Sequence, residues 1–542
     1  MAGFWLTALI FVPILGAFGV LMQNDEESIW RSAFIFSLIP LAISLYLFAI
    51  FDPHQASYQF VERYSWIPQF GISYHIGMDG ISLFLVILTT LLVSLSLLYS
   101  GGGDIEVRPR EFCFMMLILE TGLIGALLAI DLFLFYVFWE VMLVPMYLMI
   151  GIWGHGRKIY ATFKFVLFTV IGSLLMLVAI LYLVGAARAH LGHLTFDLPD
   201  LYKVPLSRVE ARWLFAGFAI AFAIKVPMWP VHTWLPDAHT EAPTAGSVML
   251  AAVMLKMGAY GFLRFAIPLF PEVAIEAVPI FMTLAIIGII YGALVAMVQP
   301  DLKRIVAYSS VSHLGFVMLG IFALNPQGLD GAMYQMLNHG VSTGALFLLV
   351  GMIYVRRHTR EVSEFGGLWK TVPIFAGIFM FVMLSSIGLP GLNGFVGEFL
   401  ILLGTFLKSQ RAAEVAVFGV VLGALYMMWA YERVWWGPIT KKVNETIKDL
   451  TGREIAVMVP LIALILLMGL YPRPLLSRME PSLNLLLDRV GAAQARLDDE
   501  HARAYAREHL REEMEQVRKQ MLRENIMTTA AVAAPVRNLA DK

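Results

Sequence analysis

Long apolar runs separated by short polar loops dominate the chain up to about residue 472. A helix of about 20 apolar residues is long enough to cross a bilayer. The pattern therefore predicts an all-α polytopic membrane protein with about 14 transmembrane helices and both termini on one side. The predicted spans are about 4–22, 32–51, 78–100, 111–130, 131–153, 160–185, 211–230, 245–270, 275–297, 302–324, 330–355, 371–406, 412–432 and 455–472.

Two stretches of the pattern are interrupted by prolines, glycines and polar residues, and both carry embedded charges. Residues 213–261 read WLFAGFAIAFAIKVPMWPVHTWLPDAHTEAPTAGSVMLAAVMLKMGAYG and contain Lys225 and Lys256. Residues 379–406 read FMFVMLSSIGLPGLNGFVGEFLILLGTF, with Glu398 just after the interruption. Paired broken helices in corresponding halves are typical of ion or substrate sites in transporters. A glycine-rich packing crossover is the structural alternative.

The two interruptions lie about five helices apart, and this spacing predicts two related five-helix units, each containing a broken helix. Because five is odd, a second unit in tandem must have inverted topology. The predicted divisions are three N-terminal helices in 1–110, the first repeat in 111–270, the second inverted repeat in 271–435, a last helix in 436–472 and a charged tail in 473–542.

The tail differs from the rest of the chain in its high content of Arg and Glu. Within it, Leu510, Met514, Val517 and Met521 recur at helical spacing, which predicts a surface amphipathic helix. Residues after about 527 are expected to be disordered. A solvated helix that packs on a neighbour is the usual interpretation of such a stripe.

Basic residues in the short loops predict the orientation of the chain. One side holds Arg31, Arg108, Arg110, Arg157, Lys158, Lys303, Arg304, Arg356, Arg357, Arg360, Lys441 and Lys442; the other holds fewer, among them Arg63, Arg188, Lys203, Arg208 and Arg264. The first side is therefore predicted to be cytoplasmic, with both termini facing outward. The long loops 52–77 and 186–211 carry aromatic residues and prolines that suit the lipid–water interface.

The composition agrees with a membrane protein, because 59% of the residues are hydrophobic and only 15% are charged. A net charge of −1 argues against a nucleic-acid partner. The single cysteine, Cys113, cannot form an internal disulfide or supply a metal cluster. No dinucleotide fingerprint, P-loop or axial-ligand pattern is present, so we expect no metal, cofactor or redox centre bound by this chain.

Charged residues inside predicted spans are the candidate chemistry, since a charge at the bilayer centre costs about 2.5–3.5 kcal/mol on insertion scales. Glu140 lies about nine residues into its span, in FLFYVFWEVMLVPMYLMIG. Paired with a lysine on a neighbouring helix, this carboxylate can stay ionised and hold that lysine charged. Lys225 and Lys256, without such a partner, bind a proton less tightly and can load and release it.

His313 and His339 lie in apolar runs and titrate near neutrality, so they can bridge Lys256 to Glu398. Each of these residues has a structural alternative: a histidine bonded to a backbone carbonyl, a lysine reaching the interface, a glutamate joining two helices. His232 and His239, seven residues apart, lack a metal-ligand pattern, which favours a structural role. The predicted proton relay comprises Glu140, Lys225, Lys256, His313, His339 and Glu398.

Three segments resemble a known family: VFWEVMLVPMYLMIG, AIKVPMWPVHTWLPDAHTEAPTAGSVMLAAVMLKMGAYG and GLPGLNGFVGEF. They are similar to the antiporter-like subunits of NADH–quinone oxidoreductase (respiratory complex I), and most similar to the subunit M family, whose mitochondrial counterpart is chain 4. The similarity extends over about residues 1–472. The glutamate before MLVPMY and the glutamate in the second broken helix favour subunit M over L, while the long charged tail departs from the family pattern.

The resemblance implies fourteen helices in which the seventh and twelfth are broken. It also implies roles: Glu140 modulates Lys225, Lys256 is the central relay lysine, His313 and His339 continue the relay, and Glu398 is the terminal proton carrier. The implied partners are the other membrane-arm subunits, with L and N as neighbours, in a bacterial inner membrane. The implied complex uses FMN, iron–sulfur clusters, NADH and a quinone such as ubiquinone, while this sequence shows no quinone pocket.

Two other functions stay open at this stage. An Mrp-type Na⁺/H⁺ antiporter subunit, or a membrane-bound hydrogenase subunit, shares the same core motifs, and only the partner proteins distinguish it. A structural membrane scaffold, whose charges fix helix packing alone, is the third hypothesis. The coupled ion cannot be inferred from the sequence, because carboxylates and lysines serve either a proton or a sodium ion.

Overall fold

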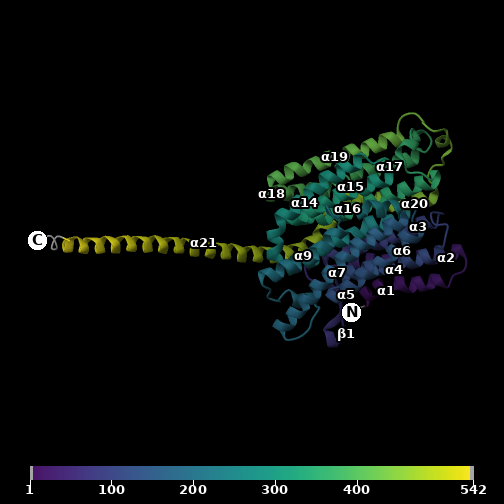
Figure 1. Ribbon diagram of the computed structural model, residues 1–542. Coiled ribbons are helices and arrows are strands. Elements are labelled where there is room, and N and C mark those ends of the chain that lie inside the picture. The colour runs from purple at the N-terminus through teal and green to yellow at the C-terminus, as the bar shows by residue number, and fades with distance from the viewer. Residues whose placement is uncertain (1–3, 538–542) are drawn as a thin grey trace. The chain divides into compact units, whose positions relative to one another are not determined.

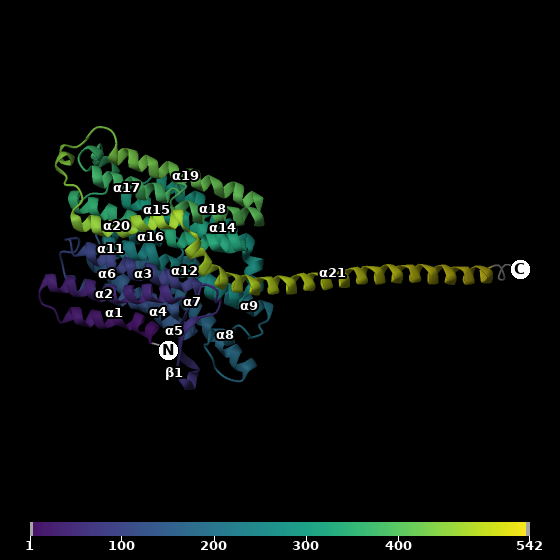
Figure 2. The ribbon, with the colours of Figure 1, turned by 180° about the vertical axis from the view of Figure 1, so that it is seen from behind.

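The computed structural model describes residues 4–537, and these residues divide into two compact units. The first unit extends to Leu487 and contains the apolar helices, while the second begins at Asp488. Figures 1 and 2 show that the long helices of the first unit run roughly side by side, with α1 and α2 at one edge and α19 at the opposite edge.

The chain begins with three apolar helices and a β-hairpin that the sequence pattern does not predict. The elements are α1 (Trp5–Leu21), α2 (Glu26–Ile50), β1 (Gln59–Ile67), η1 (Pro68–Phe70), β2 (Ile72–Met78) and α3 (Gly80–Ser100). The two strands pair antiparallel, with Arg63 opposite His75 and Tyr64 opposite Tyr74. The predicted interfacial loop 52–77 is therefore largely an ordered hairpin.

The next five membrane segments contain the first interrupted stretch. They comprise α4 (Pro109–Leu128), α5 (Leu132–Val141), α6 (Leu143–Trp153), α7 (Lys158–Leu191), α8 (Leu198–Leu201), α9 (Arg208–Lys225), α10 (Trp234–Glu241), α11 (Thr244–Met249), η2 (Leu250–Met254), α12 (Leu255–Gly261), η3 (Phe262–Ala266) and α13 (Ile267–Leu269). From α11 to α13 the chain is one continuous helix in which η2 and η3 are π-helical turns. The predicted span at 131–153 is divided at Met142.

Five further segments follow, and then one last span. They comprise α14 (Pro271–Met297), α15 (Leu302–Ala323), α16 (Pro326–Arg357), η4 (Val362–Glu364), η5 (Leu368–Lys370), α17 (Pro373–Ser386), α18 (Asn393–Lys408), α19 (Gln410–Trp435), η6 (Lys442–Thr446) and α20 (Gly452–Leu470). The predicted span 371–406 is thus two helices, α17 and α18, separated by a turn that contains Gly-Leu-Pro-Gly at 388–391.

These elements confirm the predicted fold class. Eleven helices are long and apolar enough to cross a membrane, and α1, α9 and the pair α17–α18 complete fourteen segments in the described part of the chain. The segments from α4 to α13 and from α14 to α19 make two sets of five, each with one broken helix. Since all of them lie within one compact unit, the predicted boundaries between the repeats remain a prediction.

Side-chain caps fix where several helices begin. Asp131 accepts from the N–H groups of Phe133 and Leu134 at the start of α5, and Asp301 caps α15 in the same way. Ser207 and Glu210 form a capping box at the start of α9. Such caps satisfy backbone donors that the first helical turn leaves without partners.

The most buried helices carry the polar residues of the unit. In the apolar 18-residue stretch of the α11–α13 helix and in that of α16, 100% of the residues are buried inside the protein. In the corresponding stretch of α7, only 39% are buried. Helix α7 instead exposes large apolar side chains, among them Phe163, Leu167 and Val178, as a lipid-facing helix does. Lys256 and His339 therefore lie at the centre of the bundle, away from lipid.

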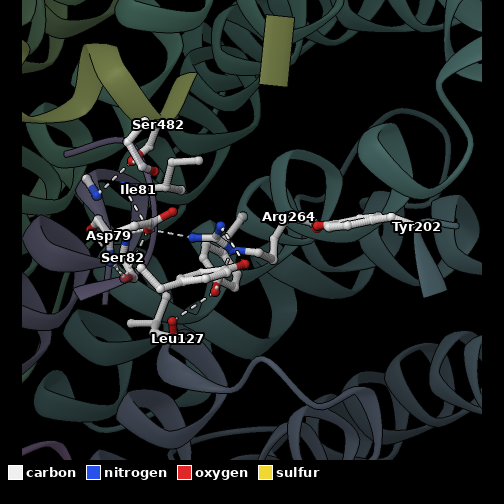
Figure 3. Close-up of polar contacts among 11 residues, drawn as sticks. Asp79, Ile81, Ser82, Leu127, Tyr202, Arg264 and Ser482 are labelled. Atoms are coloured by element: carbon white, nitrogen blue, oxygen red, sulfur yellow. Dashed lines mark hydrogen bonds and ion pairs between the residues drawn. The ribbon is translucent and has the colours of Figure 1, made fainter. Parts of the chain in front are cut away.

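The sequence analysis counts Arg264 among the basic residues of the loops, and the structure shows that this assignment is wrong. Arg264 lies in the π-helical turn η3, its side chain is only 8% exposed, and its guanidinium pairs with Asp79 at 2.5 Å. Figure 3 shows this pair beside Tyr202 and Ser482. The side chain points inward because the Asp79 carboxylate at the start of α3 compensates its charge. Counting basic residues in the loops cannot predict this pairing.

The last helix, α21 (Arg473–Arg537), crosses the boundary between the two units. Its first part belongs to the first unit, where the Ser482 hydroxyl accepts from the Gly80 N–H at 3.1 Å and donates to the Ala56 carbonyl (Figure 3). In the second unit, the stripe Leu510, Met514, Val517 and Met521 lies on this helix and is exposed. Part of the segment expected to be disordered, residues 538–542, lies outside the described residues.

Candidate functional site

Helix α9 ends at Lys225, where Pro227 and a turn interrupt the span. The Lys225 side chain is buried, with its ammonium 5.3 Å from the centre of the Trp139 ring and 5.7 Å from that of Phe165. The position at a helix C-terminus and the two aromatic faces both favour a positive charge. The break in the helix thus creates a buried site for a cation.

Glu140 is the charged group that acts electrostatically on Lys225 among the described residues. It lies at the end of α5, next to Trp139, and its Oε1 atom is buried without a hydrogen-bond partner in the described part of the chain. The Tyr136 hydroxyl also interacts with this carboxylate. The predicted partnership of Glu140 and Lys225 is therefore one of electrostatic proximity, because no direct ion pair joins them among residues 4–537.

Close packing against α4 places the end of α5. A Cβ atom on Gly122 would lie 2.9 Å from the Met142 backbone nitrogen, and one on Gly125 would lie 2.4 Å from the Phe138 ring. Helices approach closely where small residues line the contact. These two glycines let α5 and the kink at Met142 lie directly on α4, which fixes the position of Glu140.

Lys256 lies on the continuous helix formed by α11 to α13, directly after the π-helical turn η2. Its ammonium donates to the Ala251 carbonyl oxygen at 2.6 Å and lies 2.6 Å from His339 Nδ1 on α16. Lys256 as a whole is 1% exposed. π-Helical turns frequently occur at functional sites because they change which backbone groups and side chains face inward.

His339 and His313 continue the line of polar groups from Lys256. Their ring centres are 5.7 Å apart, and His313 Nδ1 lies 3.0 Å from Glu398 Oε1. Glu398 Oε1 also accepts from Gln335 Nε2 at 3.1 Å. Lys256, His339, His313 and Glu398 thus form one buried series across three helices and the second broken helix.

A small polar cavity of about 10 Å³ lies beside the two histidines. Its lining includes His313, His339 and Asn338, and each of these residues has one buried polar atom without a partner among the described residues: Nε2, Nε2 and Oδ1, respectively. A volume of about 10–15 Å³ holds one water molecule. The cavity has the size and the polar groups to connect the two rings through one water.

The broken helix α17–α18 positions Glu398 from its second turn. Gly388 adopts φ +76°, and a Cβ atom there would lie 3.0 Å from Glu398 Oε2. The Asn393 side chain bonds with Ser385 and Ser342, and the Asn393 carbonyl accepts from Asn338. The turn therefore brings the Gly388 backbone close to the carboxylate, where an unbroken helix would not.

The structure thus gathers the predicted relay residues into two groups. Glu140 and Lys225 form one group, and Lys256, His339, His313 and Glu398 form the other. Among the described residues, no hydrogen bond or ion pair joins Lys225 to Lys256. In the second group, hydrogen-bonding contacts join Lys256 to His339 and His313 to Glu398, while the two imidazole rings face each other across the small polar cavity.

The comparisons with known proteins agree with this architecture. A family described as NADH:quinone oxidoreductase/Mrp antiporter, TM, matches residues 129–423. Subunit M of NADH-quinone oxidoreductase from Rhodobacter capsulatus is 46% identical over 491 residues, covering 88% of this chain and 95% of the relative. The chain belongs to the subunit M family of NADH–quinone oxidoreductase.

Other members and structures support the same assignment. NADH-ubiquinone oxidoreductase chain 4 from Marchantia polymorpha is 43% identical over 485 residues, covering 89% of this chain and 97% of the relative. A chain of respiratory complex I from Thermus thermophilus has a TM-score of 0.81 at 34% identity, with 89% of this chain and 99% of that chain covered. A chain of the Mrp complex from Dietzia sp. DQ12-45-1b, at 24% identity and a TM-score of 0.78, shares the fold. The protein is therefore an antiporter-like membrane subunit of complex I, and other complex I subunits are its partners.

Several buried charged groups of this subunit M family member are missing from the sequence prediction. Glu120 on α4 is fully buried, and neither carboxyl oxygen has a partner among the described residues. Lys303 is 5% exposed and donates to the Ala242 carbonyl oxygen. Glu120 is visible in the apolar run MMLILETGLIG, whereas Lys303 reads as an ordinary loop lysine beside Arg304.

Replacing Gly394 by alanine should disturb the second broken helix. The added Cβ would lie 2.1 Å from the Ser385 carbonyl oxygen, so α17 and α18 must move apart. We expect a loss of about 1–3 kcal/mol of stability from overpacking, seen as a lower midpoint of thermal unfolding in detergent. Gly377→Ala on α17 is the control, because nothing lies within 4 Å of its Cβ position. Equal midpoints for the two variants would contradict the packing described here.

Proposed function

We propose that this chain translocates protons in the membrane arm of NADH–quinone oxidoreductase, through the relay formed by Glu140, Lys225, Lys256, His339, His313 and Glu398. The observation that carries the proposal is the continuous buried series from Lys256 to Glu398, with contacts of 2.6 and 3.0 Å at its two ends. Intramembrane ionisable residues that pair with one another mark proton and ion pathways.

Each imidazole in this series has two nitrogens with different surroundings. His339 Nδ1 meets Lys256, and His313 Nδ1 meets Glu398, while both rings line the water-sized cavity between them. An imidazole can accept a proton on one nitrogen and release another from the second. A proton can therefore pass from the Lys256 ammonium to His339, across the cavity to His313, and on to the Glu398 carboxylate.

Glu140 and Lys225 regulate this transfer in the proposal. An ionised Glu140 favours the charged form of Lys225. A cation at Lys225 in turn disfavours a second positive charge at Lys256, because like charges repel strongly in a medium of low dielectric constant. When Glu140 separates from Lys225, the electrostatic potential at Lys256 changes, and with it the proton affinity of Lys256. In this way the first broken helix is coupled to the second group of residues.

The complex supplies the driving reaction. NADH oxidation and quinone reduction occur in partner subunits, with FMN and iron–sulfur clusters as the expected cofactors, and this chain contributes the ionisable side chains of the relay. Antiporter-like subunits L and N are the expected neighbours in the bacterial inner membrane. Similarity to subunit M over 88% of the chain favours this assignment over an Mrp-type antiporter, whose chain shares the fold.

Replacement of Glu140 by glutamine tests the proposal. The amide has nearly the same size but cannot hold Lys225 charged, so we expect the assembled complex to lose most of its NADH-driven proton gradient in inverted membrane vesicles. Glu111→Gln, at an exposed position at the start of α4, is the control and should pump normally.

Co-purification must accompany this measurement. Flavin and iron–sulfur absorbance should purify with the tagged chain in mild detergent, and a redox-silent assembly would point to the cation antiporter instead. If the Glu140→Gln complex assembles, transfers electrons and pumps the normal number of protons per electron, the relay is wrong and the structural scaffold remains as the hypothesis for this chain.

A further inference from the structure

A charged cavity opens at the end of the bundle where α3 is joined to α4. Its volume is about 250 Å³, and six of its lining residues are charged: Asp104, Arg356, Lys448, Asp449, Arg453 and Glu454. Lys448 and Arg453 are exposed, so the cavity communicates with solvent. It lies where α3 and α16 end and α20 begins.

Asp104 forms the inner wall of this cavity. Its Oδ1 atom accepts from the Thr244 hydroxyl at 3.0 Å and from the Tyr99 hydroxyl at 3.4 Å. Its Oδ2 atom is buried and has no partner among residues 4–537. Burial raises the pKa of the Asp104 carboxyl, while the Thr244 hydroxyl and the Lys303 charge act in the opposite direction. The carboxyl therefore has one oxygen fixed and one oxygen free to bind a proton.

Lys303 lies on the inner side of Asp104. Its buried ammonium donates to the Ala242 carbonyl oxygen at 2.5 Å, and the charges of Asp104, Glu241, Asp301 and Arg360 all act on it. Arg360 in turn pairs with Asp301 at 3.2 Å. Lys303 is thus a buried ammonium that interacts electrostatically with Asp104 at the cavity and with charged groups of both signs around it.

His239 is near enough to both Lys303 and Lys256 for their charges to act on its ring. Its ring is fully buried, stacks on Phe347 at 4.7 Å, and has no hydrogen-bond partner for either nitrogen in the described part of the chain. The His239 carbonyl accepts from Ser247 at the start of the helix that carries Lys256. The polar groups therefore continue from Asp104 through Lys303 and His239 to Lys256.

We propose that Asp104 is the proton-accepting group at the aqueous entrance of the relay, taking protons from the charged cavity and passing them by way of Lys303 and His239 to Lys256. This inference rests on the proposed proton-translocating function and adds an entrance to it. In this step the Asp104 carboxylate takes a proton from water in the cavity and then passes it to the next base along the series, which regenerates the carboxylate.

The structural alternative gives Asp104 only the task of holding Thr244 at the start of α11. Asparagine can accept the same hydrogen bonds from Thr244 and Tyr99 through its side-chain oxygen, but it cannot bind and release a proton. Asp104→Asn therefore separates the two roles. Under the structural alternative this variant behaves like the parent chain; under the proposal it does not.

The experiment compares proton uptake per electron transferred in inverted vesicles that contain the assembled complex. For Asp104→Asn we expect a severalfold lower ratio of pumped protons to electrons, with a deficit that grows as the pH rises because proton capture then becomes limiting. Asp104→Glu should restore the ratio. Glu106→Gln, an exposed residue of the same loop, is the matched control and should leave the ratio unchanged.

A second measurement is independent of pumping. The single native cysteine, Cys113, is buried, so Asp104→Cys provides the one thiol that faces the cavity. We expect a charged, water-soluble maleimide to modify it in the intact complex.

The proposal falls if Asp104→Asn pumps with the normal ratio at every pH, or if the thiol of Asp104→Cys resists the reagent. Its failure is distinguishable from failure of the proposed function. If Glu140→Gln pumps poorly and Asp104→Asn pumps normally, only the proposed role of Asp104 as the entrance is wrong. If both variants pump normally, the proposed relay itself is wrong.

Discussion

Replacing Lys256 by methionine is expected to stop proton transfer through this subunit while leaving the protein assembled. Methionine has a similar length and fills the buried site, but it can neither donate to the Ala251 carbonyl nor exchange a proton with His339 Nδ1. The relay would then begin at His339 with no group to load it. We expect the ratio of pumped protons to electrons in vesicles to fall to the level of a complex in which this subunit does not pump.

Two variants make this result specific. Lys256→Arg keeps a positive charge, but a guanidinium cannot be deprotonated in a protein, so it should lose pumping as well. Lys370→Met makes the same change at an exposed lysine and should pump normally. Normal pumping by Lys256→Met would mean that protons bypass the central lysine, and the proposed series of residues would be wrong.

The second large effect concerns stability. Replacing Arg264 by methionine leaves the buried Asp79 carboxylate without its partner at 2.5 Å (Figure 3). Breaking one side of a buried ion pair costs about 3–5 kcal/mol. Arg264 also donates to the hydroxyls of Tyr260 and Tyr58, so the variant should show a much lower thermal midpoint and less assembled chain in the membrane.

A double variant separates the unpaired charge from lost packing. Asp79→Asn keeps the cap on the Ile81 and Ser82 N–H groups, because an asparagine oxygen caps a helix as well as aspartate does. Asp79→Asn combined with Arg264→Met should therefore recover much of the stability that Arg264→Met alone loses, measured by the same thermal midpoint. Equal losses in the single and double variants would show that the ion pair contributes little and that packing around Arg264 dominates.

Much of this architecture follows from local sequence signals. Pro227 and Pro230 break one helix and the Gly-Leu-Pro-Gly turn at 388–391 breaks another, because proline and glycine disfavour a regular helix. Lys256 and Glu398 stand out for the opposite reason: a charge within an apolar run requires a compensating partner. The sequence predicts that both belong to one relay. In the structure Lys256 contacts His339 and Glu398 contacts His313, and the centres of the two histidine rings lie 5.7 Å apart.

Other features depend on contacts that a single sequence does not contain. The β-hairpin at Gln59–Met78 is not predicted from the sequence, because its aromatic residues also fit an interfacial loop. The π-helical turns beside Lys256 have no sequence signature. Arg264 near the end of its span resembles a loop residue until Asp79 from a distant helix is placed beside it. Asp104 lies in a glycine-rich loop, and only the fold brings it within reach of the Lys303 charge on α15.

The central claim is that a proton reaches Glu398 from Lys256 through the two histidines during turnover. Infrared difference spectroscopy of the assembled complex tests it most directly, because a carboxyl group that gains a proton acquires a C=O stretching band. We predict a band during NADH–quinone turnover that is absent in Glu398→Gln and in Lys256→Met. A carboxyl band that persists unchanged in Lys256→Met, with normal electron transfer, would contradict the relay.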